Sequence, residues 1–208
     1  SKRVYISGDD DQAIFRWAGA DIEHLIKMDG NISVLNQSYR VPLDVHLIAT
    51  QVVSRIKNRR PKEWAPRAYK GEVRYHAYPG AVDVSEGNWL ALATCSYMLN
   101  DIEEDLLTMH HGLINAGVPW DVAFTTIGEK DKSYVMSLEK HGGLGVDPKI
   151  NLSTIHMAKG GECDNVMLLT DLSRANQDEM EVSPDDTDRV FYVGATRAKQ
   201  SLHIINPQ

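Results

Sequence analysis

Gly8-Asp9-Asp10-Asp11-Gln12-Ala13-Ile14-Phe15-Arg16-Trp17-Ala18-Gly19-Ala20 is the stretch that says most about the fold of this chain. It directly follows an apolar run, Val4–Ile6, which has the composition of a β-strand that ends in a loop. In α/β proteins such loops lie at the carboxyl edge of the sheet, where ligands bind. The pattern therefore predicts that Gln12 and an exposed Trp17 lie at that edge.

Apolar runs and helical patterns alternate along the rest of the chain. Further strands are predicted at 32–35, 72–78, 89–93, 122–127, 150–155, 166–169 and 202–205, and helices at 21–28, 42–56, 101–116, 132–140 and 183–199. Ser183-Pro184 is the clearest helix start, because Ser caps a helix and Pro tolerates its first turn. This alternation predicts an α/β fold, with a mostly parallel sheet covered by helices on both faces.

Composition describes an ordinary globular chain. Of its 208 residues, 42% are hydrophobic and 25% charged, and no apolar run approaches the ~20 residues that cross a membrane. The two cysteines lack metal-ligand spacing, which favours a reduced, cytoplasmic location and no metal site. A net charge of −7 argues against a general nucleic-acid coat. The basic segment 55–70 could touch a nucleic-acid backbone or could be a solvated connection.

Three later stretches also place polar side chains beside predicted strands or helices. The first is Leu35-Asn36-Gln37-Ser38-Tyr39-Arg40. Its Tyr39 and Arg40 could offer a nucleotide an aromatic platform and a cation, or could be a packed tyrosine beside a surface arginine. The second, Ile150–Val166, runs from a strand into a Gly-containing loop that carries His156, Lys159 and Glu162. Such a loop could grip a polar ligand, although a lone histidine is more often structural.

The third stretch is Asp188-Arg189-Val190-Phe191-Tyr192-Val193-Gly194-Ala195-Thr196-Arg197-Ala198-Lys199. On a helix, Arg189, Tyr192, Thr196 and Lys199 would fall near one face, and Arg197 would point elsewhere. The alternative interpretation makes these residues surface cations, with Phe191 and Val193 in the core.

In this order, the four stretches resemble the motifs numbered three to six of the UvrD/Rep branch of superfamily-one DNA helicases. The resemblance runs from Gly8 to Ile205, weakly between residues 57 and 149. The form Lys159-Gly160-Gly161-Glu162 and the compact length are similar to phage-type members. The resemblance implies a RecA-like fold: residues 1–30 would be the tail of a first motor domain, and 31–208 a second one without a large inserted subdomain.

The resemblance also implies a role for each residue. Gln12, Arg40 and Arg197 would be catalytic, the two arginines reaching the γ-phosphate of ATP. Tyr39 would stack on the adenine and Glu162 would bind the ribose. DNA would be contacted by Trp17, Phe15, Arg16 and His156, with support from Thr154, Lys159 and Arg189. ATP would bind with Mg²⁺, whose ligands are expected in an amino-terminal half.

No Gly-x-x-x-x-Gly-Lys-Thr/Ser loop occurs in the sequence, so the phosphate-binding loop is expected upstream. We therefore expect the carboxyl-terminal part of an ATP-dependent DNA helicase, inactive as an ATPase by itself. Its partners would be single-stranded DNA, junctions of single- and double-stranded DNA, and the amino-terminal motor domain, with no membrane. The alternatives are a stand-alone module that binds nucleotide, DNA or a partner protein, and the motor segment of a helicase–nuclease.

Overall fold

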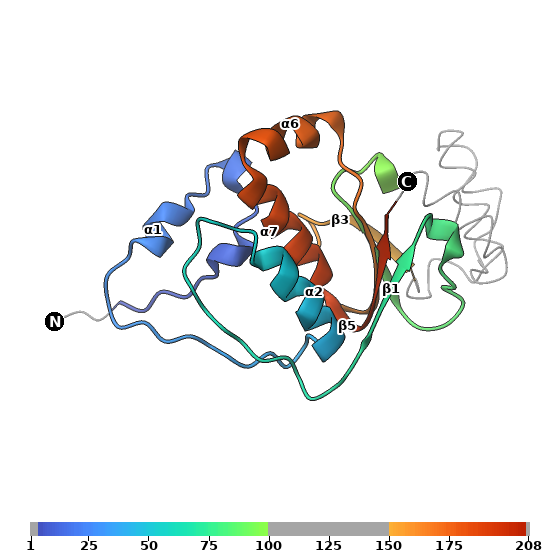
Figure 1. The fold of residues 1–208 in the computed structure, drawn as a ribbon, viewed down its shortest axis with the longest axis horizontal. Coiled ribbons are helices and arrows are strands. Elements are labelled where there is room, and N and C mark those ends of the chain that lie inside the picture. The colour runs from blue at the N-terminus through green and yellow to red at the C-terminus, as the bar shows by residue number, and fades with distance from the viewer. Residues whose placement is uncertain (1–3, 100–149, 207–208) are drawn as a thin grey trace, which may run out of the picture.

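The computed structural model describes residues 4–99 and 150–206. A five-stranded sheet forms its centre, with strand order β1-β5-β4-β2-β3 (Figure 1). The strands are β1 (Glu72–His76), β2 (Trp89–Ala93), β3 (Ile150–Thr154), β4 (Cys163–Leu169) and β5 (Ala198–Ile205). All four pairings between them are parallel. The predicted α/β fold with a parallel sheet is confirmed.

The described helices are α1 (Ile22–Ile26), α2 (Leu43–Val53), α6 (Arg174–Val182) and α7 (Pro184–Ala195). Short 3-10 turns occur at η1 (Asp10–Gln12), η2 (Arg16–Ala18) and η3 (Pro79–Ala81). Helices α2 and α7 pack against each other and lie on the same face of the sheet (Figure 1). Asp21 caps α1 by accepting a hydrogen bond from the Glu23 amide, as its residue type favours.

Both faces of the sheet are buried. Along β2, Leu90 and Leu92 join the cluster that contains α2 and α7, whereas Trp89, Ala91 and Ala93 join a cluster on the opposite face. Such double burial explains why this strand reads as one continuous apolar run. The prediction placed helices on both faces. In the described part of the chain, α2 and α7 cover one face, and the segment around η3 contributes cover to the other.

Two predicted strands are wrong. Residues 4–6 and 32–35 have no strand structure, and their side chains are exposed, to 79% for Val4 and 88% for Leu35. A strand needs a neighbour for its backbone hydrogen bonds, and neither run finds one among the described residues. Close by, Gln37 forms a single bridge with Ala65. Composition alone predicted the strands, but composition does not supply a partner.

The end of the last helix was also misplaced. Helix α7 stops at Ala195, before the predicted end near residue 199, and β5 begins at Ala198 instead of 202. The Thr196 hydroxyl lies 2.9 and 3.1 Å from the carbonyl oxygens of Tyr192 and Val193 and can donate to either. A side chain thus supplies a hydrogen bond to the carbonyls of the last helical turn. Helix α6 was not predicted, because it has no buried residue and hence no apolar face. The elements predicted at 101–116, 122–127 and 132–140 lie outside the described residues.

Candidate functional site

The predicted site residues gather at two opposite edges of the sheet. Glu162 and Arg197 directly precede β4 and β5, so they lie at the amino ends of these parallel strands. His156 follows β3, so it lies at the carboxyl end of that strand. A strand of this length separates the two edges by roughly 20 Å. The loop between β3 and β4 crosses this distance and carries His156 at one end and Glu162 at the other.

The amino edge combines cations with two carboxylates, Glu162 and Asp164, of which Asp164 lies 3.3 Å from Lys199 Nζ. Arg40 Nη1 lies 3.6 Å from Glu162 Oε2, and Lys199 Nζ lies 3.8 Å from Glu162 Oε1. Arg40 is also close enough to Arg197 to affect its ionisation. Tyr39, the neighbour of Arg40 in the chain, is 86% exposed. The structure thus brings together Arg40, Glu162 and Arg197, with an uncovered aromatic ring next in sequence.

Arg197 is buried and forms three hydrogen bonds with neighbouring residues of the same chain. Its side chain is buried, and its guanidinium donates to the Val193 carbonyl at 2.8 Å, the Gly161 carbonyl at 3.2 Å and the Thr196 hydroxyl at 3.1 Å. Burial, with the positive charge of Arg40, lowers the pKa of Arg197 to about 10, which keeps it charged at neutral pH. The interpretation of Arg197 as a surface cation is wrong, because it fastens the loop before β4 to the end of α7.

Arg40 is the opposite case. Its Nε is buried and has no hydrogen-bond partner among the described residues, and its 3.6 Å pair with Glu162 is loose. A guanidinium offers five donors in a planar fork that suits phosphate and carboxylate oxygens. A buried donor without an acceptor is costly in a folded protein unless a ligand or water completes it. The amino edge therefore has the charge and the spare donors to bind an anion.

The carboxyl edge is aromatic. The ring centroids of Phe15 and Trp17 lie 6.3 Å apart, and His156 lies 5.8 Å from the first and 6.4 Å from the second. Lys159 Nζ lies 5.2 Å from the centre of the Phe15 ring. Trp17 is 73% exposed, so its ring is available for stacking. This group can hold a flat, electron-rich ligand by its faces.

A hydrogen bond fixes the histidine of this group. His156 Nε2 lies 3.0 Å from the Ile14 carbonyl oxygen, which can only accept, so Nε2 carries a proton. Burial lowers the pKa of His156, which favours the neutral ring. The Thr154 hydroxyl accepts from the Met157 amide at 3.3 Å and shapes the turn that carries His156.

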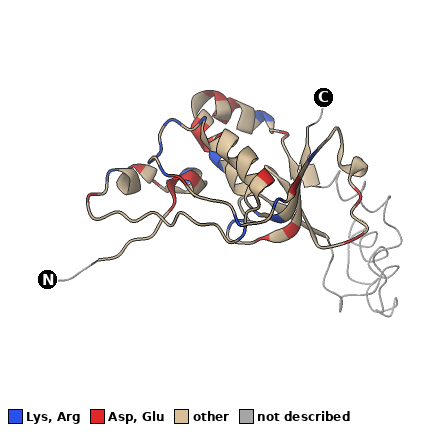
Figure 2. Ribbon diagram, turned by 60° about the horizontal axis from the view of Figure 1, so that its bottom comes forward, with Lys and Arg blue, Asp and Glu red and all other residues tan. Residues whose placement is uncertain are grey.

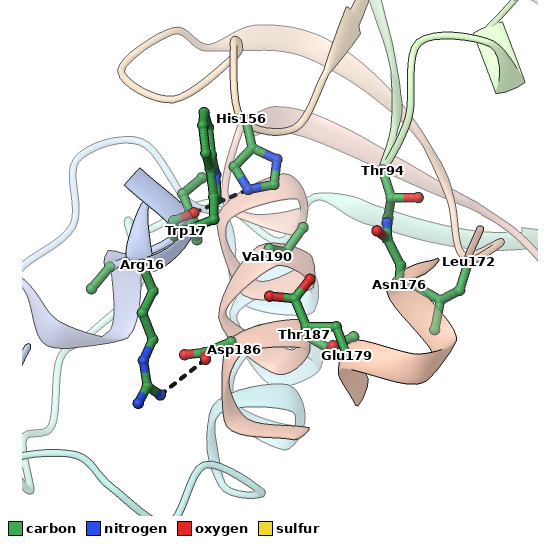
Figure 3. Close-up of a pocket in the computed structure, with 12 residues that line it drawn as sticks. Arg16, Trp17, Thr94, His156, Leu172, Asn176, Glu179, Asp186, Thr187 and Val190 are labelled. Carbon is green, nitrogen blue, oxygen red and sulfur yellow. Dashed lines mark hydrogen bonds and ion pairs between the residues drawn. The ribbon is translucent and has the colours of Figure 1, made fainter. Parts of the chain in front are cut away.

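A hollow of about 250 Å³ opens beside these rings (Figure 3). Arg16 reaches across its side and pairs with Asp186 at 3.1 Å, while Trp17 and His156 form one wall. Other lining residues were missed by the sequence analysis, namely Thr94, Asn176 and Glu179. Asn176 and Glu179 lie on α6, which had no recognisable pattern, and no motif marked Thr94.

Gln12 and Arg189 make their contacts around η1 and the first half of α7. The Gln12 side-chain amide donates to Asp9 Oδ2 at 2.6 Å. Arg189 is fully buried, and its guanidinium donates to the Asp10 carbonyl at 2.9 Å and to Asp186 Oδ1 at 3.0 Å. Arg189 therefore ties α7 to η1, and its interpretation as a surface cation is wrong.

Within the described residues, 4–99 and 150–206, no group of three or more His, Cys, Asp or Glu side chains is placed to hold a metal ion. In the same ranges, no helix has the length and apolar character required to span a bilayer.

Comparison with known proteins finds similarity to helicases over parts of the chain. Residues 131–208 match the family model of the UvrD-like helicase C-terminal domain. The chain is 30% identical over 96 residues to the ATP-dependent DNA helicase PcrA of Bacillus subtilis, a match that covers 43% of this chain and 13% of that protein. It is 26% identical over 222 residues to a probable DNA helicase of Mycoplasma pneumoniae, covering 98% of this chain and 38% of that protein.

A solved structure of the C-terminal domain of a possible DNA helicase from Lactobacillus plantarum is 13% identical, with a TM-score of 0.40. That match covers 82% of this chain and 88% of the solved chain. The present chain spans between 13% and 38% of the length of the two curated relatives described above.

Proposed function

We propose that this chain is the carboxyl-terminal part of an ATP-dependent DNA helicase of the UvrD/Rep-like kind, because it is similar to the UvrD-like helicase C-terminal domain and to proteins named as DNA helicases. The whole enzyme would move along single-stranded DNA and unwind duplex DNA in the cytoplasm. The observation that supports this function most is the convergence of Arg40, Glu162 and Arg197 at one edge of the sheet. Phage origin stays a prediction.

At the amino edge, the chain would complete an ATP site formed with a first motor domain. Residues 1–30 would belong to that first domain and 31–208 to the second. Arg40 would bind the γ-phosphate with its spare donors, Arg197 would add positive charge, Tyr39 would stack on the adenine and Glu162 would accept from the ribose. Charge spreads over the terminal oxygens during phosphoryl transfer, so fixed guanidinium groups lower the barrier. ATP would bring Mg²⁺, with its protein ligands in the first domain.

At the carboxyl edge, Trp17 would stack on a base of single-stranded DNA, which contributes about 1–3 kcal/mol and tolerates any sequence. Phe15 and His156 support the Trp17 ring, and Arg16 would meet the DNA backbone. The loop between β3 and β4 offers a route between the two edges, because it carries His156 and Glu162 at its ends. Movement of Glu162 on nucleotide binding would therefore reach His156 through one short loop.

The test uses the protein encoded by the complete reading frame that contains this chain, and beside it the 208-residue chain alone. The complete protein should hydrolyse ATP with Mg²⁺ faster when single-stranded DNA is added, and should unwind a duplex with a single-stranded tail. The chain alone should show no turnover, since it has no phosphate-binding loop. A complete protein that binds neither ATP nor single-stranded DNA would overturn the proposal, and turnover by the chain alone would overturn the division of roles.

A further inference from the structure

A buried cluster of charges lies outside both edges, where η1 meets the loop after α2. Lys62 Nζ lies 3.0 Å from Asp9 Oδ1 and 2.9 Å from Asp11 Oδ2, and it also contacts Asp10 Oδ1. Arg59 binds both carboxylate oxygens of Asp11, at 2.8 and 2.7 Å. Figure 2 shows acidic and basic segments close together on the side of the molecule where α1 lies. We call these five side chains the ionic latch.

The ionic latch is too deeply buried to be a chance surface contact. Asp11 is 0% exposed and Asp10 is 4% exposed. Carboxylates at that depth are stable only when they are paired, so removal of a cation leaves an uncompensated buried charge. Burial would lower the pKa of Lys62, but its bonds to Asp10 and Asp11 and the charge of Asp9 outweigh burial and raise it. The basic segment 55–70 was expected to meet nucleic acid or solvent, yet Arg59 and Lys62 point into the protein instead.

The ionic latch holds the residues on which the proposed function depends. Asp9 binds Lys62 through one carboxylate oxygen and the Gln12 amide through the other, at 2.6 Å. The backbone amide of Arg60 donates to Asp10 Oδ2 at 2.6 Å. The Arg60 guanidinium donates to the carbonyls of Ile26 and Met28. The loop at 58–62 thus grips the segment 9–28 at its start and at its end.

We propose that Lys62 is a positioning residue, which holds the segment that carries Gln12 and Trp17 in place by neutralising the Asp9–Asp11 turn. The inference rests on the proposed function for the roles of Gln12 and Trp17, and for the assignment of residues 1–30 to the first motor domain. With that assignment, the ionic latch is a contact between the two motor domains that needs no nucleotide. Opening it would free the segment that carries Phe15 and Trp17 to move away from His156.

Amide hydrogen exchange of the 208-residue chain, without DNA or nucleotide, tests the latch directly. Lys62→Met should speed exchange in peptides covering residues 9–20 by about tenfold or more, while β2 and β5 change by less than about twofold. Lys62→Arg keeps the charge and should restore protection. Arg55→Met is the matched control, because Arg55 comes from the same basic segment but pairs with Asp188, with Nε at 3.0 Å from Oδ1. It should leave residues 9–20 protected.

Unchanged exchange at residues 9–20 in Lys62→Met, or equal acceleration throughout the chain, would overturn the latch. If Lys62→Met does not fold, Asp9→Asn takes its place. The Asp9 side chain is 32% exposed, so the chain should still fold when its negative charge is removed. This variant should loosen the same peptides several-fold, and unchanged exchange there would again count against the latch.

A second readout separates positioning from stability. In the complete protein, Lys62→Met and Trp17→Ala should weaken binding of a poly-dT oligonucleotide non-additively, because Lys62 acts through Trp17. Additive losses would overturn the positioning role even if the exchange result held. An oligonucleotide that does not bind the unaltered protein at all would count against the proposed function, while the exchange result would still decide the latch.

Discussion

Replacement of Arg40 should separate catalysis from folding more cleanly than any other change at the amino edge. Arg40→Ala removes one loose, half-exposed ion pair and a buried Nε that has no partner among the described residues. An ion pair of this kind stabilises a fold by about 0–1 kcal/mol, so the melting temperature should hardly change. Hydrolysis should nevertheless fall by about 10³–10⁵-fold, the range for loss of a γ-phosphate arginine.

Arg197→Ala should behave differently. Its guanidinium makes three hydrogen bonds to its own chain in a buried position. Loss of three hydrogen bonds and of a buried side chain should lower stability by about 2–4 kcal/mol, along with activity. Loss of activity in Arg197→Ala is therefore ambiguous, whereas loss in Arg40→Ala is not.

The assay measures DNA-stimulated ATP turnover and thermal unfolding on the same preparations of the complete protein. Arg74→Ala serves as the control, since Arg74 pairs with Glu72 on the exposed surface of β1, with a side chain that is 58% exposed. It should leave turnover and melting temperature unchanged. The reasoning is refuted if Arg40→Ala retains turnover within about tenfold of the unaltered protein, or if it unfolds as readily as Arg197→Ala.

Other changes test the rest of the structure. At Gly71, where φ is +72°, an added Cβ would lie 2.6 Å from side-chain atoms of Pro42, so Gly71→Ala should lower the free energy of unfolding in chemical denaturation by about 2–4 kcal/mol. Gly19 has a similar φ but open space around it, so Gly19→Ala should lower that free energy by only about 1 kcal/mol. Equal losses in the two variants would contradict the clash with Pro42. Burial, together with the neighbouring His76, lowers the pKa of His203 from 6.5 to about 4, so the folded chain binds fewer protons than the unfolded chain between these pH values. Stability should fall by up to about 3 kcal/mol on acidification through this window, and His203→Asn should flatten that slope. Trp17→Ala should weaken oligonucleotide binding by about 5- to 150-fold in fluorescence anisotropy, and a change below about twofold would remove its stacking role.

The central strands of the sheet were predictable from the sequence because a strand buried on both faces is apolar at nearly every position. The strand Trp89–Ala93 is buried on both faces, and its apolar run marks it without any partner being known. Residues 4–6 are equally apolar, yet a strand there depends on a neighbour that the run cannot reveal. Helix α6 has the reverse difficulty, because an exposed, polar helix carries no periodic signal.

The candidate site divides in the same way. Arg40, Glu162 and Arg197 were found by their motifs, but their separation from His156 by the length of a strand depends on topology. The ionic latch was missed because Lys62 and the Asp9–Asp11 run lie about fifty residues apart, and no feature of the sequence around either one indicates that they pair. Pairing between distant charges follows from the fold and not from local pattern.

The central claim is that the amino edge of this chain faces the adenine and phosphates of ATP. Photolabelling of the complete protein with 8-azido-ATP, followed by mapping of the modified peptide, tests it most directly. We expect the label on the peptide that contains Tyr39 and Arg40, with protection by excess ATP. Saturable labelling that maps entirely to peptides far from Tyr39, Glu162 and Arg197 would contradict it.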